Sequence, residues 1–123
     1  DVVQADGGTR TAAVTGAYVA LYQAVLVLVR QNIVPSLPLR GAVAATSVGI
    51  VGGEILLDLC YEEDARADVD FNVVMTEEGS FVEIQGAAEG KPFEQKTMDA
   101  LVALAKQGIG GLLEVQRSAV EGL

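Results

Sequence analysis

The sequence contains no histidine, a single cysteine and few aromatic residues among its 123 residues. Without histidine the chain cannot build a Ser-His-Asp or Cys-His nucleophile, and it lacks a usual zinc ligand. Cys60 alone cannot form an internal disulfide, so we expect a cytoplasmic location and a small core side chain rather than a nucleophile. Half of the residues are hydrophobic but only 5% are aromatic, which predicts one domain with an aliphatic core.

Basic residues are also scarce, with eight Lys and Arg against 17 Asp and Glu and a formal net charge of −9. Nucleic acid phosphates are held by Lys and Arg, so this charge argues against the segment attracting nucleic acid by itself. If the chain serves RNA, the basic surface has to come from elsewhere.

One apolar run, Ala12–Val29, is nearly long enough to cross a membrane. Polar residues and a glycine interrupt it, and the rest of the chain has a soluble pattern, so we expect no membrane span. The run instead predicts a central helix over residues 10–33 that is apolar on every face and therefore enclosed by other structure. Pro35 and Pro38 end it.

The remaining pattern predicts strands and then helix. Strands are expected over residues 42–51, 54–60, 69–76 and 81–88, the first two joined by a Gly52-Gly53 hairpin turn. Residues 1–5 are typical of the tail of a strand. Helical spacing over residues 94–122 predicts a helix, which Gly108, Gly110 and Gly111 are expected to split. This order favours an α+β fold with a mixed β-sheet packed on helices.

Gly7-Gly8-Thr9-Arg10 opens the long helix and is a candidate anion site. Free N–H groups at a helix start favour negative charge, Gly8 allows close approach, and Thr9 can cap the helix and add a hydroxyl donor. Arg10 is unfavourable in a first helical turn unless an anion or an acid lies nearby. The alternative is a glycine-rich turn with a solvated Arg, since short Gly motifs are weak signals.

The densest acidic run, residues 62–70, leads directly into a buried-strand pattern. Asp64 and Asp70 bracket a short irregular stretch, so both can turn back to one point, where they suit Mg²⁺ or general acid–base work. Asp68 alternates with Asp70 and either shares its face or marks the strand edge. The alternative is a solvated acidic loop in which Arg66 pairs locally.

Together these motifs resemble ribonuclease PH. Residues 1–12 resemble its phosphate-binding segment and the start of its central helix. Further matches follow in order at Ser47–Ile50, Leu57–Leu59, Tyr61–Asp64, Asp70–Thr76 and Phe81–Gly86. The resemblance spans residues 1–123 but only about the second half of a ribonuclease PH subunit. Because the chain begins with Asp1 rather than Met, we interpret it as that C-terminal half, a piece of a longer protein.

The resemblance implies a ribonuclease PH-like core, of the type also found in domain 2 of ribosomal protein S5. It implies a phosphorolytic 3′-to-5′ exoribonuclease that trims precursor tRNA, in which inorganic phosphate attacks the RNA end and releases a nucleoside diphosphate. Gly8, Thr9 and Arg10 would then bind phosphate, while the catalytic acids Asp64 and Asp70 would coordinate Mg²⁺ or assist proton transfer. RNA, the missing N-terminal half and a hexameric ring are the implied partners.

Some features depart from the family. Cys60, Ala65 and Phe71 replace the usual residues, which we interpret as packing variation. The absent first half would carry a further phosphate-binding Arg, so we expect the segment alone to lack full activity. Polynucleotide phosphorylase and exosome subunits resemble the same fold, and a non-catalytic ring subunit would keep the fold without the chemistry. Retention of the two acids together with Arg10 favours the enzyme.

Overall fold

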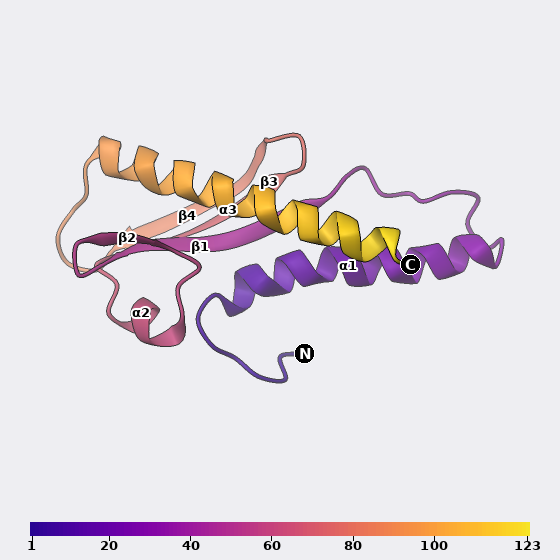
Figure 1. Cartoon of the computed structure of the whole chain (residues 1–123), viewed down its shortest axis with the longest axis horizontal. Coiled ribbons are helices and arrows are strands. Elements are labelled where there is room, and N and C mark those ends of the chain that lie inside the picture. Colours follow the sequence, from indigo (N-terminus) through magenta and orange to yellow (C-terminus); the bar gives the residue numbers. More distant parts are fainter.

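The computed structural model describes residues 1–123 in full (Figure 1). Its elements are α1 (Thr9–Arg30), β1 (Val43–Val51), β2 (Glu54–Leu57), α2 (Tyr61–Ala65), β3 (Val69–Thr76), β4 (Phe81–Ala88) and α3 (Gln95–Glu121). The strands form one sheet in the order β2-β1-β3-β4, and every pairing is antiparallel. The α+β fold class is confirmed, but the sheet is antiparallel rather than mixed.

The β1–β2 hairpin has the predicted turn. Gly52 and Gly53 both have positive φ angles, 57° and 82°, which a two-residue hairpin of this twist requires and which glycine adopts without strain. The second strand ends at Leu57 instead of residue 60. Asp58 takes a positive φ of 59°, which turns the chain out of the strand.

The core lies between α3 and one face of the sheet (Figure 1). Its fully buried members come from β1, β3 and α3: Ala44, Val48, Val69, Phe71, Val73, Met75, Leu101, Ala105 and Ile109. Phe71 is the only aromatic residue among them, which confirms the aliphatic core. Because side chains alternate along a strand, Asp70 and Asn72 lie on the face of β3 opposite α3.

The C-terminal helix is unbroken, so the prediction that its glycines would split it was wrong. Each glycine costs about 1 kcal/mol of helix propensity relative to Ala. Buried Ala105 and Ile109 on either side of Gly108 outweigh this cost. Gly108 also allows close packing, because a Cβ there would lie 2.7 Å from Leu57 Cδ1 of β2.

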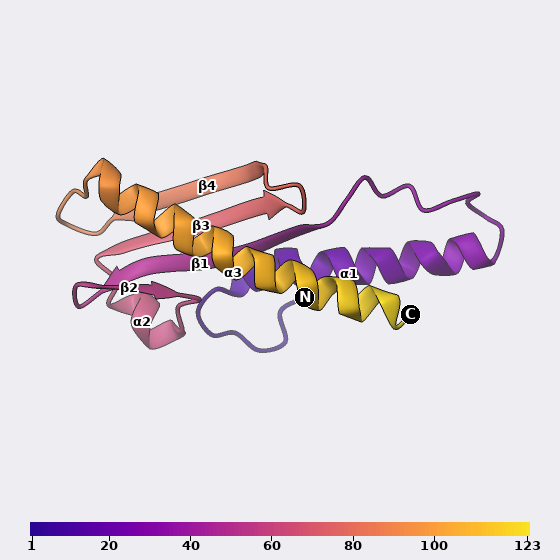
Figure 2. The same cartoon turned by 45° about the horizontal axis from the view of Figure 1, so that its top comes forward.

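The long apolar helix α1 is not enclosed, which contradicts the expectation for residues 10–33. Thr11 is its only fully buried residue. Leu21, Val27 and Leu28 are exposed, as is Ile33 just beyond its end. Figures 1 and 2 show that the second half of α1 extends past the sheet, where the C-terminal end of α3 covers it only in part. By length and composition alone α1 could cross a membrane.

The first half of α1 is attached to the uncovered edge of β1. The short strand β2 pairs only with Val48–Val51, so the preceding part of that edge needs other partners. Thr15 Oγ1 accepts a hydrogen bond from Ala45 N–H at 3.0 Å. The same hydroxyl donates to the Ala45 carbonyl oxygen at 3.1 Å. Buried Gln116 of α3 donates to the carbonyls of Thr15 and Val43, both at 2.8 Å. These bonds lock α1, α3 and β1 together.

We predict that Gly86→Ala destabilises the fold by about 1–3 kcal/mol through overpacking. Gly86 of β4 lies under the ring of buried Phe71, and an added Cβ would come within 2.5 Å of Phe71 Cε2. Gly110→Ala is the matched control, because Gly110 lies on the exposed side of α3 with no atom near an added Cβ. Gly110→Ala should stabilise the helix by up to about 1 kcal/mol. Urea unfolding followed by circular dichroism measures both, and equal effects would contradict the packing argument.

Candidate active site

The first turn of α1 forms one wall of the site. Gly8 is the residue that caps the helix, with a φ of 65°, so the predicted capping role of Thr9 was wrong. The Thr9 hydroxyl instead donates to the Asp6 carbonyl oxygen at 2.8 Å. An added Cβ on Gly7 would overlap the backbone of Leu59 and Cys60, so this turn lies directly against the connection between β2 and α2.

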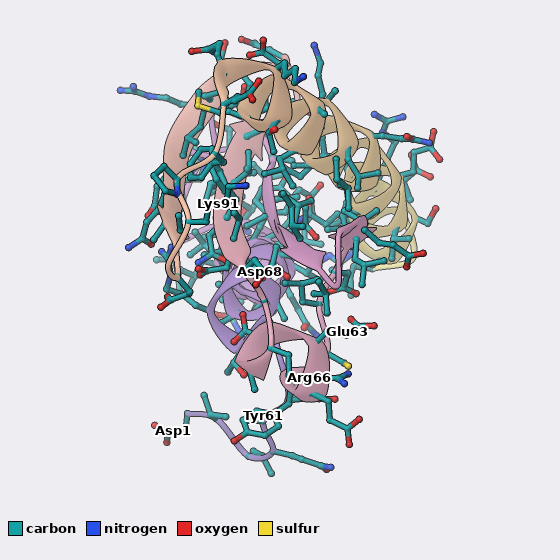
Figure 3. All side chains as sticks on the ribbon, turned by 90° about the vertical axis from the view of Figure 1, so that its left-hand side faces the viewer. Asp1, Tyr61, Glu63, Arg66, Asp68 and Lys91 are labelled. Atoms are coloured by element: carbon teal, nitrogen blue, oxygen red, sulfur yellow. The ribbon has the colours of Figure 1, made fainter.

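Asp6 joins this turn to α2, a link that no local sequence pattern indicated. Its Oδ1 accepts hydrogen bonds from Gly7 N–H (2.8 Å) and from Tyr61 N–H (2.6 Å). Figure 3 shows Tyr61 beside the N-terminal segment that starts at Asp1. Residues 1–5, which we expected in a strand, are irregular. The same carboxylate therefore fixes the position of both sides of the site.

Helix α2 is a short acidic turn that carries Asp64. Cys60 caps its start, and the Cys60 backbone N–H donates to Glu63 Oε2 at 3.0 Å. Arg66 follows the helix, and its Nε donates to the Glu62 carbonyl. Cys60 is exposed, so its assignment to the core was wrong. Asp64 is exposed as well, and it lines one cavity together with Asp70 of β3.

That cavity brings together all five residues proposed from the sequence. Its volume is about 180 Å³, and it is lined by Gly8, Thr9, Arg10, Ser47, Asp64, Asp70, Phe71 and Asn72. Pockets for drug-sized ligands start at about 300 Å³, so this volume suits a small anion rather than a whole nucleotide. The helix start, α2 and β3 thus converge on one point.

Two polar residues of the cavity were missed by sequence reasoning. Asn72 could have been found, because it lies two residues after Asp70 and so points to the same face of β3. Ser47 pairs with Asn72 across β1 and β3, and this register is not visible in the sequence. Ser47 Oγ already accepts a hydrogen bond from Leu59 N–H at 3.1 Å, which holds it at the cavity wall.

Asp70 lies where its charged form is disfavoured. Burial raises the pKa of Asp70 above its ordinary value, and the negative charges of Asp64 and Glu89 raise it further. Asp68 does not take part: it lines a separate hollow together with Lys91 at the end of the sheet (Figure 3). Of the two roles left open for Asp68, it therefore marks the edge of the strand.

Arg10 is the only cationic residue at the cavity, and its guanidinium is held by β4. Nη1 and Nη2 donate to the two carboxylate oxygens of Glu83 at 3.1 and 3.0 Å, and Nη2 also donates to Gln85 Oε1 at 2.9 Å. The hydrogen bond and charge of Glu83 raise the pKa of Arg10, while the same hydrogen bond lowers the pKa of Glu83. Glu83 is thus the nearby acid that an Arg in a first helical turn requires.

The donor set fits a Mg²⁺ ion. No group of three or more His, Cys, Asp or Glu side chains gathers as a metal site anywhere in the chain. Mg²⁺ is commonly held by one or two carboxylates, waters and the phosphates of its substrate, so it does not need a third protein ligand. Asp64 and Asp70 are the two carboxylates at this cavity and would hold the ion.

A larger hollow lies beside the site, between α1, α3, β1 and β2. Its volume is about 430 Å³ and its walls are mainly small or apolar, including Ala12, Gly16 and Leu112. Asp58 is its single charged residue. The smaller cavity gathers an Arg and two carboxylates, so it is the better candidate for chemistry despite its size.

Known proteins share this architecture. The crystal structure of Rrp46 from rice (Oryza sativa) superimposes with a TM-score of 0.77 at 15% sequence identity. The match covers 98% of this chain and 51% of the rice chain, so the chain spans about half the length of that relative. The rice structure thus supports the fold.

The sequence model of the 3′ exoribonuclease family, domain 2, matches residues 41–108, which is more than half of the chain. The matched region runs from the start of β1 into α3 and contains Asp64 and Asp70 but not the Gly8-Thr9-Arg10 turn. It confirms the resemblance to the second half of ribonuclease PH. The chain belongs to the 3′ exoribonuclease family, of which it contains domain 2.

Proposed function

We propose that this chain supplies the reaction centre of a phosphorolytic 3′-to-5′ exoribonuclease that trims the 3′ ends of precursor tRNA. The observation that carries the proposal is the single cavity at which Arg10, Asp64 and Asp70 meet although they come from α1, α2 and β3. An arginine beside a helix start suits a phosphate anion, and paired carboxylates suit a divalent cation or proton transfer.

In this reaction an oxygen of inorganic phosphate attacks the terminal phosphorus of the RNA. The bond from that phosphorus to the 3′ oxygen of the preceding nucleotide breaks, and a nucleoside diphosphate leaves. Gly8, Thr9 and Arg10 orient the attacking anion, and an aspartate assists proton transfer to the departing oxygen. Mg²⁺ on Asp64 and Asp70 would offset negative charge on the phosphates.

Further chains complete the site in this proposal. Apart from Arg10, the cavity carries only negative charge, and the whole chain has a net charge of −9. Phosphate and RNA therefore need basic groups from elsewhere. We assign them to an N-terminal half of the subunit, which would also cover the exposed apolar residues of α1, and to neighbouring subunits in a ring of six. The assembly would act in the cytoplasm.

A non-catalytic ring subunit is the second candidate. The contact that favours it is the pairing of Arg10 with Glu83, because it leaves the cavity without a free cation in this chain. In that case the fold would serve only subunit contacts. Release of nucleoside diphosphates from RNA in the presence of phosphate separates the two functions, and release of monophosphates without phosphate would indicate hydrolysis.

The first prediction concerns the two acids. Asp64→Asn or Asp70→Asn should lower phosphorolysis of a tRNA with a 3′ extension by at least about 100-fold, because a carboxylate needed for proton transfer or cation binding is removed. The assay uses the assembled protein and follows nucleoside diphosphates by chromatography. Asp68→Asn is the matched control, since Asp68 lines a different hollow, and its activity should be unchanged. Full activity in both site variants would remove the acids from the mechanism.

The second prediction concerns stability. The pKa of Asp70 is raised, so its charged form is disfavoured in the folded protein, and stability falls as pH rises through that raised pKa. Asp70→Asn removes this penalty. The variant should have a higher melting temperature than the wild type at pH 7, and the difference should shrink below pH 4. Thermal unfolding at both pH values measures it, and a variant less stable at pH 7 would contradict the electrostatic argument.

The third prediction concerns phosphate. Arg10→Ala should raise the KM for phosphate by at least about tenfold, the size expected for loss of a charge-assisted contact, with a smaller change in kcat. Arg30→Ala is the control, because Arg30 is the last residue of the same helix and donates to the Leu123 carbonyl, far from the cavity. An unchanged phosphate dependence of the Arg10 variant would exclude that role.

A further inference from the structure

We propose that Glu83 and Gln85 set the phosphate affinity of the site by competing with phosphate for the guanidinium of Arg10. This inference rests on the proposed function and names two residues of β4 that act through Arg10 rather than on the reacting atoms. It follows from the number of donors that Arg10 has available, from the exposure of the contact and from the charges around the cavity.

The guanidinium of Arg10 has few donors left for phosphate. A guanidinium has five N–H donors, one on Nε and two on each Nη. Glu83 takes one from Nη1 and one from Nη2, and Gln85 takes another from Nη2. The two that remain, on Nε and Nη1, point from opposite edges of the group and cannot grip one anion together. A two-pronged phosphate contact, the strongest that Arg makes, therefore requires that Glu83 or Gln85 gives up its hydrogen bonds to Arg10.

The carboxylate of Glu83 also occupies the donors that a phosphate would use. Both of its oxygens face the paired Nη donors in the arrangement by which Arg holds a phosphate. Glu83 and Gln85 are two residues apart on β4 and so present their side chains on one face, and Gln85 pairs with the cavity residue Asn72 across β3. The competitor is thus built into the sheet beside the cavity.

The contact is easily broken. The side chains of Arg10 and Glu83 are 50% and 39% exposed. Exposed ion pairs of this kind contribute little, so a phosphate that forms charge-assisted bonds can displace Glu83. The fraction of molecules in which Arg10 is free sets the apparent affinity for phosphate. A weak pair reduces that affinity by about two- to sixfold.

The negative charges at the cavity give a second reason for the pairing of Arg10 with Glu83. Asp64 and Asp70 face the same cavity, so without phosphate the guanidinium has three carboxylates as possible partners. Pairing with Glu83 keeps Arg10 on the β4 side, away from an ion pair with the two aspartates. The aspartates then stay available for a cation or a proton.

The test is the phosphate dependence of Glu83→Gln in the assembled protein. Its KM for phosphate should fall about two- to sixfold with kcat little changed, because the amide accepts hydrogen bonds without the charge that holds Arg10. Glu78→Gln removes the same charge from the turn between β3 and β4 and should leave KM unaltered. In the Arg10→Ala background, Glu83→Gln should give no further change, since both act through one group.

An unchanged or raised KM in Glu83→Gln would overturn the inference, as would an equal gain in the Arg10→Ala background. If the wild type releases no nucleoside diphosphates while binding phosphate, the proposed function fails separately. In that case titration with inorganic phosphate followed by ³¹P NMR decides the inference: tighter binding by Glu83→Gln supports it, and equal or weaker binding overturns it. Circular dichroism confirms that the variant is folded.

Discussion

The short length of β2 is the constraint on which the arrangement of this chain depends. Only four residues of β1 find a partner in β2, so the rest of that edge exposes backbone groups that must be satisfied. Thr15 provides both a donor and an acceptor to Ala45, and Asp58 N–H donates to the Ser47 carbonyl at 2.7 Å. The first turn of α1, which begins six residues before Thr15, is thereby held beside the sheet.

The position of the site follows from this attachment. With α1 fixed at Thr15, Arg10 lies within reach of β4, while Asp6 ties the preceding turn to α2 and hence to Asp64. On β3, buried Phe71 holds its strand against α3 and leaves Asp70 on the other face. Each charged residue of the cavity is therefore positioned by a nearby residue that packs or hydrogen-bonds within the fold.

Much of this fold could be predicted from the sequence, because the patterns were local. A buried-strand pattern predicted β3 and alternation predicted β4, both with the observed bounds, and two adjacent glycines predicted the hairpin. The unbroken α3 could not be predicted, since the packing of Leu57 against Gly108 joins residues distant in the chain. The prediction that α1 is enclosed was inferred from its composition. Composition shows how apolar a helix is, but not whether the same chain contains the residues that would pack against it.

The candidate site likewise has residues that could be predicted from the sequence and contacts that could not. Its five proposed residues were identified from motifs, and the alternation that places Glu83 and Gln85 on one face was readable too. Their partner Arg10 lies 73 residues from Glu83, and the pairing depends on the fold alone. Asp6 and Ser47 were missed for a related reason: each acts through a backbone N–H of a distant segment, and a backbone group leaves no signature in the sequence.

The uncovered flank of α1 has a consequence for how such a chain survives in a cell. Contiguous apolar surface on a protein attracts chaperones and drives self-association until something covers it. Leu21, Val27 and Leu28 leave such a flank on a helix whose other end builds the cavity. One rigid helix therefore carries both the apolar flank and one wall of the cavity, so a chain whose flank stays uncovered is exposed to aggregation and degradation.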